Sequence, residues 1–197
     1  ISLGGIVCSK SINVAGDVFT NDIQNYIRQQ HGIRIGERTA EDIKCVIGAA
    51  VPELENEPED YIFTGSNMLT NLPQTVTLNY SEIAYALDKS LVKLDNALMD
   101  VLQEMPPELY SDVVRNGIYL AGGGALIKGL DQRLSKVSGL PVHIAEDPLR
   151  DVEAVDENLR GDGGGNLADA ALHHDRVTAR ERAAYKRAPC NLVGLGV

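Results

Sequence analysis

Residues 117–139, GIYLAGGGALIKGLDQRLSKVSG, combine a short apolar run, three consecutive glycines and a helical pattern. Residues 118–121 are wholly apolar, which predicts a short buried strand. Gly122, Gly123 and Gly124 predict a turn, and residues 125–138 predict a helix that ends at Gly139. This succession of strand, glycine turn and helix is the strongest local signal in the chain.

The glycine turn suits either of two purposes. Glycines allow a ligand to approach the backbone closely because they lack a Cβ, and the start of the following helix favours anions. The turn can therefore bind a base or a phosphate, or it can simply let strand and helix pack closely. A dinucleotide fingerprint would require glycine or alanine at position 127, where this chain has isoleucine. A P-loop would require lysine at position 130 and serine or threonine at 131, where this chain has leucine and aspartate, so neither motif is present.

Glu41 and Lys44 form a second constellation, three residues apart on one face of a predicted helix. A carboxylate accepts hydrogen bonds from ribose hydroxyls, and a lysine stem can cover a base while its ammonium donates to ring or sugar oxygens. The alternative is an exposed ion pair that contributes about 0.2–0.5 kcal/mol. The pattern alone favours the ion pair.

The composition is that of a globular protein with room for one domain or two small lobes, since the chain has 197 residues, of which 44% are hydrophobic. Its net charge of -10 argues against non-specific binding to nucleic acid or to an anionic membrane. Three dispersed cysteines and four histidines show no zinc or disulfide pattern, and no nucleophile–base pair stands out. Residues 161–165 (GDGGG) predict a flexible linker, and the sequence after about residue 152 lacks clear periodicity.

The remaining elements are predicted from periodicity and from helix-capping residues. We expect three helices to be capped, by Asp17, by Thr39 with Asp42, and by Ser81. The helix that Ser81 caps should run to about Met105, with leucines and one isoleucine along its buried face. Pro106-Pro107 should end that helix and start a short one. Strands are expected at two places in residues 1–14 and at 61–64, 75–80 and 141–144, with a solvated loop at 52–60.

Several segments together resemble the second half of the MreB family of bacterial actin-like proteins. They are ISLGGIV at 1–7, VAGD at 14–17, GERTAEDIK at 36–44, MPPEL at 105–109, GIYLAGGGALIKGLD at 117–131 and GLPVHIAEDPL at 139–149. These segments follow in order over about three quarters of the chain. The glycine block and GERTAEDIK are specific in combination, although neither is specific alone.

The resemblance implies an α/β fold, that of an actin-like ATPase (ribonuclease H-like) lobe with a small inserted α+β subdomain. Residues 1–30 and 91–150 would form the sheet-and-helix base, residues 31–90 the inserted subdomain, and residues 151–197 a divergent, poorly ordered tail. The nucleotide ligands that it implies are Glu41, Lys44, Gly122, Gly123, Gly124 and Ala125. No catalytic or metal-ligating residue is assigned.

The resemblance further implies an ATP-binding cytoskeletal protein that forms membrane-associated filaments in the cytoplasm and guides cell-wall synthesis and rod shape. Expected partners are other filament subunits and proteins of cell-wall synthesis and cell shape, without nucleic acid. The family's phosphate loops, and the residues that manage Mg²⁺, would precede Ile1, so we expect this chain alone neither to hydrolyse ATP nor to polymerise normally. A chaperone-type ATPase or sugar-kinase lobe of the same fold, and a non-functional fragment, are the alternatives.

Overall fold

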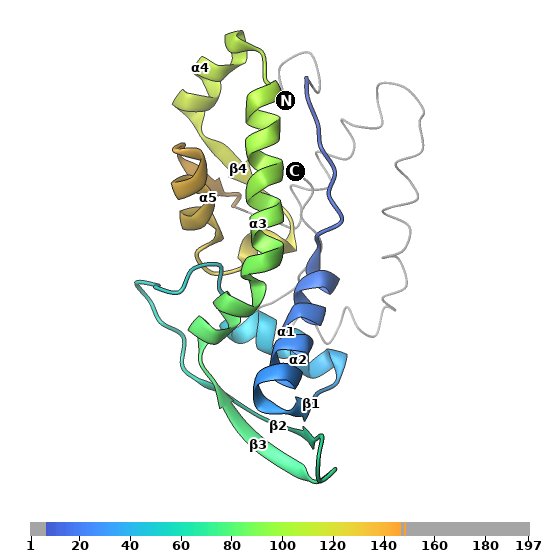
Figure 1. Cartoon of the computed structure of the whole chain (residues 1–197). Helices are drawn as coiled ribbons and strands as arrows, with labels where there is room; N and C mark the ends of the chain where they lie inside the picture. The colour runs from blue at the N-terminus through green and yellow to red at the C-terminus, as the bar shows by residue number, and fades with distance from the viewer. Residues whose placement is uncertain (1–6, 147, 149–197) are drawn as a thin grey trace, which may run out of the picture.

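The computed structural model describes residues 7–146 and 148 of the chain (Figure 1). Helices and strands alternate irregularly along the sequence. The helices are α1 (Gly16–His31), α2 (Glu37–Ile47), α3 (Tyr80–Glu104), α4 (Pro107–Asn116), the 3₁₀ helix η1 (Gly123–Leu126) and α5 (Leu130–Ser138). The strands are β1 (Ile33–Arg34), β2 (Tyr61–Asn67), β3 (Pro73–Leu78), β4 (Ile118–Leu120) and β5 (Val142–Ile144).

The long helix α3 connects the two ends of the structure. In Figure 1, β1, β2 and β3 lie at one end, and α4, β4 and α5 lie at the other. The predicted apolar stripe is confirmed, because six side chains at helical spacing are buried: Ile83, Leu87, Leu91, Leu94, Leu98 and Leu102. The helix ends before Pro106-Pro107, and α4 begins at the second proline, as predicted.

The three predicted N-terminal helix caps, Asp17, Thr39 and Ser81, were wrong. Helix α1 begins at Gly16, one residue before Asp17, which lies in the first turn where its charge suits the helix dipole. Helix α2 begins at Glu37, so Thr39 is already helical and cannot form a capping box with a residue three positions on. The cap of α3 is Asn79, whose extended backbone lets its side chain accept from the Ser81 N–H at 2.9 Å.

Three antiparallel strands, in the order β1-β2-β3, form the sheet at one end. Tyr61 pairs with Leu78 and Ser66 with Pro73, so β2 and β3 make a hairpin. The hairpin confirms both predicted strands, although β2 extends three residues beyond the predicted limit of 64. Residues 52–60 contain no helix or strand, in agreement with the predicted loop.

At the other end, β4 and β5 pair in parallel, with Ile118 opposite Val142. The helix predicted for residues 125–138 is instead divided into η1 and α5. Gly129 separates them because its φ of 73° is left-handed, a conformation that interrupts a right-handed helix. Gly139, with φ of 70°, ends α5 as predicted.

The structure does not confirm the two strands predicted in residues 1–14. Residues 1–6 lie outside the described range, and residues 7–14 contain no strand. Residues 7–14 are instead joined to α3 by side-chain contacts, among them an ion pair between Lys10 and Asp100. The predicted tail, residues 151–197, also lies outside the described residues.

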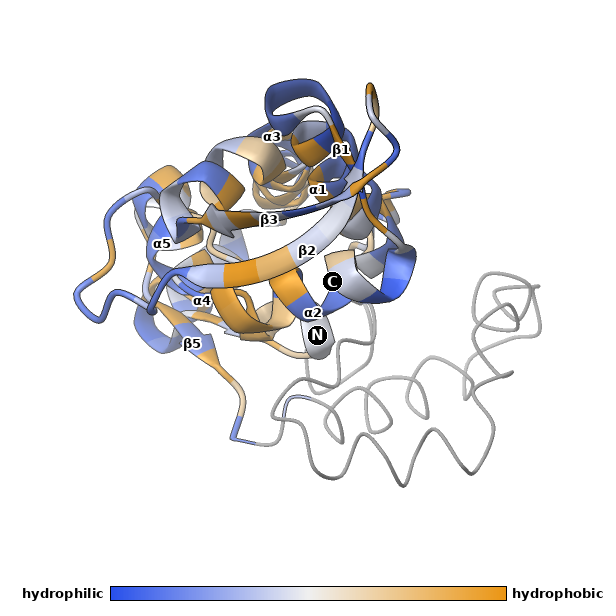
Figure 2. Ribbon diagram, turned by 90° about the horizontal axis from the view of Figure 1, so that it is seen from below, coloured by the Kyte–Doolittle hydropathy of each residue, from blue (hydrophilic) through white to orange (hydrophobic). Residues whose placement is uncertain are grey.

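One hydrophobic core extends through α1, α2, α3, α5 and the strands. It is built mainly from Ile, Leu and Ala, and its buried aromatic members are Phe19, Phe63 and Tyr80. Figure 2 shows the hydrophobic segments of α1 and α3 gathered behind the hairpin. Because this core contains residues from both 31–90 and 91–150, the division into a base and an inserted subdomain stays a prediction.

Candidate functional site

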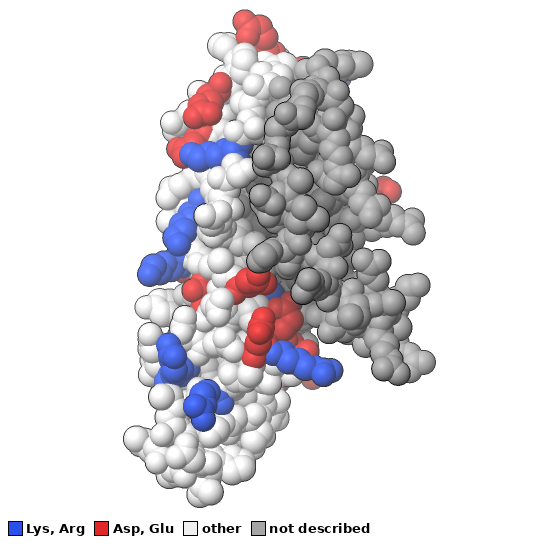
Figure 3. Space-filling model, turned by 90° about the vertical axis from the view of Figure 1, so that its right-hand side faces the viewer, with Lys and Arg blue, Asp and Glu red and all other residues white. Residues whose placement is uncertain are grey.

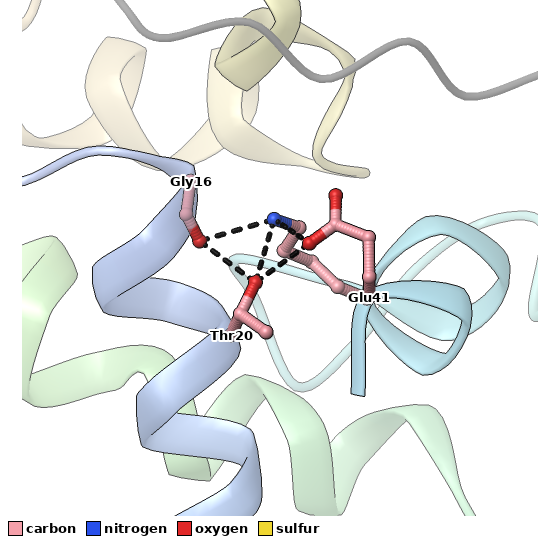
Figure 4. Close-up of polar contacts among 4 residues, drawn as sticks. Gly16, Thr20 and Glu41 are labelled. Carbon is pink, nitrogen blue, oxygen red and sulfur yellow. Dashed lines mark hydrogen bonds and ion pairs between the residues drawn. The ribbon is translucent and has the colours of Figure 1, made fainter. Parts of the chain in front are cut away.

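Helix α2 presents two different faces. Ile43 and Ile47, four residues apart, are fully buried in the core. Glu41 and Lys44 lie on the side of α2 that meets the first turn of α1, where they contact Gly16 and Thr20 (Figure 4). The core packing of the isoleucines therefore fixes the position of the two polar side chains.

The Lys44 ammonium is surrounded by acceptors from the protein. Its Nζ lies 3.0 Å from the carbonyl oxygen of Gly16, 2.9 Å from Oγ1 of Thr20 and 2.7 Å from Oε2 of Glu41. An ammonium group has three protons, so these three contacts use all of its donors. Only 1% of the Lys44 side chain is exposed, so this pair is not the exposed ion pair of the sequence-based alternative.

Glu41 is partly exposed, unlike Lys44: 25% of its side chain is accessible to solvent. Its Oε2 accepts from the Thr20 hydroxyl at 2.7 Å and from Lys44. Figure 4 shows the other carboxylate oxygen pointing away from both partners. A carboxylate that is held through one oxygen and partly exposed can accept further hydrogen bonds through the other.

The glycine turn combines a left-handed backbone with burial. Gly122 has φ of 89° and ψ of 165°, and its N–H donates to the carbonyl of Pro148 at 2.6 Å. Ala125 N–H donates back to the carbonyl of Gly122 at 3.1 Å, which closes the first turn of η1. Gly123 and Gly124 therefore precede the first internal hydrogen bond of η1, and their amides have no partner within that helix.

Backbone hydrogen bonds connect the end of α2 to the segment that follows η1. Ala50 N–H donates to the carbonyl of Lys128 at 2.8 Å, and Lys128 N–H donates to the carbonyl of Gly48 at 3.3 Å. Gly129 packs so closely that an added Cβ would lie 2.5 Å from Cγ2 of Val51. The structure thus joins the segment after Glu41 and Lys44 to the segment after Gly122–Ala125.

Arg133, in α5, reinforces the same junction and was not identified from the sequence. It donates to Asp95 at 2.9 Å and to Asp88 at 2.8 Å in α3, and to the carbonyl of Ala50 at 3.2 Å. Burial lowers the pKa of the Arg133 guanidinium, but the hydrogen bonds that it donates to Asp95 and Asp88 outweigh the effect of burial, so the pKa is raised. Oδ1 of Asp95 is buried and has no partner in the described part of the chain.

Thr20 was likewise missed. Its contact with Glu41 joins residues 21 positions apart, in two helices, and no local pattern predicts that contact. The two histidines in the described part of the chain lie elsewhere: Nε2 of His31 is 3.1 Å from Oε2 of Glu82, and the ring of His143 is tilted by 40° against that of Tyr119. Within residues 7–146 and 148, no group of three or more His, Cys, Asp or Glu side chains is placed to hold a metal ion.

Comparison with known proteins gives one consistent family. The model of the family described as MreB/Mbl protein matches residues 1–158. The cell shape-determining protein Mbl of Bacillus subtilis (strain 168) is 42% identical over 149 residues, which cover 76% of this chain and 44% of Mbl. The cell shape-determining protein MreB of Escherichia coli (strain K12) is 44% identical over 149 residues, which cover 76% of this chain and 42% of MreB.

A solved structure supports the same assignment. The crystal structure of MreB 5 of Spiroplasma citri bound to AMPPNP superposes with a TM-score of 0.74 at 38% identity, covering 79% of this chain and 46% of that one. The fold is therefore α/β and of the actin-like class, as predicted. The chain belongs to the MreB/Mbl family, and it spans less than half the length of these relatives.

Proposed function

We propose that this chain contributes the base-and-ribose side of an ATP site in an actin-like protein that forms filaments and determines cell shape. The observation that carries the proposal is the pair of backbone hydrogen bonds between Lys128 and residues Gly48 and Ala50. These bonds join the segment after Glu41 and Lys44 to the segment after Gly122–Ala125. The solved relative from Spiroplasma citri is bound to AMPPNP, an ATP analogue, and the curated relatives are named for cell shape. ATP is therefore the expected nucleotide.

In the proposed site, the partly exposed carboxylate of Glu41 accepts hydrogen bonds from the ribose. The buried glycine turn, Gly122–Gly124 with Ala125, lies against the nucleotide, because glycines there leave room for a flat ligand near the backbone. Lys44 remains a predicted ligand, although its ammonium would have to release one of its present acceptors in order to donate to the nucleotide. Mg²⁺ would accompany the phosphates, held by groups outside this constellation.

The wider role follows from the family. We propose that the protein assembles with copies of itself into filaments in the cytoplasm, that the filaments associate with the membrane, and that proteins of cell-wall synthesis and cell shape are its partners. No helix in the described part of the chain is both long and apolar enough to span a membrane. On the described part of the face in Figure 3, lysine and arginine are interspersed with aspartate and glutamate. This mixture and the net charge of -10 do not favour nucleic acid as a partner.

Calorimetric titration of the purified chain with ATP tests the nucleotide site. Glu41→Gln keeps the shape of the side chain but removes its charge, and we expect it to weaken ATP binding about five-fold, since charged acceptors make stronger hydrogen bonds. Glu37→Gln is the matched control, because it makes the same change at an exposed position on the same helix. Equal effects of the two substitutions, or no binding by the unaltered chain, would reject the site.

Light scattering of a longer protein that contains this chain tests the filament role. Nucleotide-dependent scattering and filaments in electron micrographs are expected with ATP. Transfer of phosphate to a sugar, without filaments, would instead favour a kinase of the same fold.

A further inference from the structure

We propose that Thr20 is a positioning residue, which holds the Glu41 carboxylate in the orientation that receives the ribose hydroxyls. The inference rests on the proposed nucleotide site and adds a residue to it. Thr20 lies in α1, is buried and would not itself touch the nucleotide. Its effect would pass entirely through Glu41.

The Thr20 hydroxyl donates preferentially to Glu41. Two acceptors lie within reach: the carbonyl oxygen of Gly16 at 2.9 Å and Oε2 of Glu41 at 2.7 Å. A hydroxyl has one proton to donate, so it serves one acceptor at a time. Oε2 is both the closer acceptor and the charged one, and charge-assisted hydrogen bonds are the stronger kind. The Gly16 carbonyl also accepts a hydrogen bond from Lys44, so it has a donor even when Thr20 donates to Glu41.

The two oxygens of the Glu41 carboxylate have different surroundings. Thr20 and Lys44 both donate to Oε2 of Glu41, at 2.7 Å each. Two donors from different helices fix the plane of the carboxylate more closely than the lysine alone could. The other oxygen points away from them in Figure 4, and the side chain is partly exposed. That oxygen is then presented to a ligand in a fixed direction, which reduces the entropy lost on binding.

The Thr20 hydroxyl lies between Lys44 and Glu41 in a short series of hydrogen bonds. Lys44 donates a hydrogen bond to Oγ1 of Thr20 at 2.9 Å, and the Thr20 hydroxyl in turn donates one to Oε2 of Glu41. The hydroxyl therefore acts as both acceptor and donor between the two ends of the ion pair. Valine at this position would have the same shape but neither capacity, whereas serine would keep both.

Discrimination between ATP and its 2′-deoxy and 3′-deoxy analogues tests the inference, measured by calorimetry on the purified chain. Loss of one hydrogen bond between a ribose hydroxyl and a carboxylate weakens binding by about ten-fold or more, so the unaltered chain should prefer ATP by that factor. Thr20→Val should reduce this preference to about two-fold while changing the affinity for the deoxy analogue little. Thr20→Ser should restore the preference.

Thr64→Val is the matched control, because it removes an exposed hydroxyl of the same residue type from the β2–β3 hairpin. Circular dichroism checks that each variant folds. If Thr20→Val does not fold, the test is made with Thr20→Ser, which must keep the preference for ATP over the deoxy analogues. If Thr20→Val keeps the full preference for ATP, or weakens ATP and the deoxy analogues equally, the inference is overturned and the nucleotide site stands. If the unaltered chain does not bind ATP, or does not distinguish ribose hydroxyls, the ribose contact fails and the role of Thr20 fails with it.

Discussion

Replacing Arg133 by methionine should destabilise the fold strongly, because Arg133 is the cation in a largely buried group of charges. Its side chain is 15% exposed, and that of its partner Asp95 is 11% exposed. In Arg133→Met, Asp95 would lose the donors to Oδ2 while Oδ1 already lacks a partner among the described residues. Removing one member of a buried ion pair typically costs about 3–5 kcal/mol, because the other charge stays buried and unpaired.

Asp88 provides the matched control within the same group. It also accepts from Arg133, at 2.8 Å, but its side chain is 55% exposed. Solvent screening limits such a pair to about 1 kcal/mol or less, so Asp88→Asn should change the free energy of unfolding only slightly. Combining Arg133→Met with Asp95→Leu should recover part of the loss, since an apolar pair no longer leaves a buried charge behind.

Urea denaturation followed by far-ultraviolet circular dichroism measures these free energies. The chain has no tryptophan, so the helical signal is the suitable probe. A domain of this kind is typically stable by about 5–15 kcal/mol, and the expected loss is therefore a large fraction of the total. A loss of less than about 1 kcal/mol in Arg133→Met, or an equal loss in Asp88→Asn, would show that the buried charges do not depend on Arg133 in this way.

Three further predictions concern a glycine, a helix cap and a tyrosine. Gly129→Ala should lower the free energy of unfolding by more than about 2 kcal/mol, because the new Cβ would lie 2.5 Å from a Val51 side-chain carbon and the positive φ adds strain. Gly139 has a similar φ but open space around it, so Gly139→Ala should lower the free energy of unfolding by only about 1–2 kcal/mol. Equal losses for the two variants in urea denaturation would contradict a steric clash at Gly129. Asn79→Ala should cost about 1 kcal/mol as the loss of a cap, with Ser81→Ala nearly neutral in the same assay; the reverse order would restore Ser81 as the cap. Burial is the largest cause that raises the pKa of Tyr26, and the charge of Glu82 raises it further. The native state therefore holds the Tyr26 proton more tightly than the unfolded chain does, and stability is lost as pH rises through about 10 and above. Tyr26→Phe should make unfolding less sensitive to pH in that range, and an unchanged alkaline limb would show that this tyrosine does not contribute.

Much of the fold could be predicted because the pattern within each element is local. The apolar stripe of α3 repeats at helical spacing, so both the helix and its buried face follow from the sequence. The two hairpin strands alternate over enough residues to be recognised. The caps were harder to predict, since Asn79 and Ser81 are both good capping residues, and only the extended backbone at Asn79 decides between them.

The break between η1 and α5 could not be predicted from helical periodicity. Residues 125–138 fit one helix, but Gly129 adopts a left-handed conformation and leaves no room for a Cβ beside Val51, which lies far away in the sequence. The candidate site shows the same limitation. Glu41 and Lys44 could be paired from their spacing, whereas Thr20 and Arg133 are connected to the site through contacts between distant segments.

The junction at Lys128 also bears on how the protein folds. The bond from Arg133 to the carbonyl of Ala50 closes a span of 83 residues, whereas the hairpin pairs segments only a short loop apart. Closing a long loop costs more chain entropy and tends to occur later than local pairing. We therefore expect the hairpin and the individual helices to form first and the two halves of the candidate site to meet last. During refolding, recovery of nucleotide affinity should lag behind recovery of helix content.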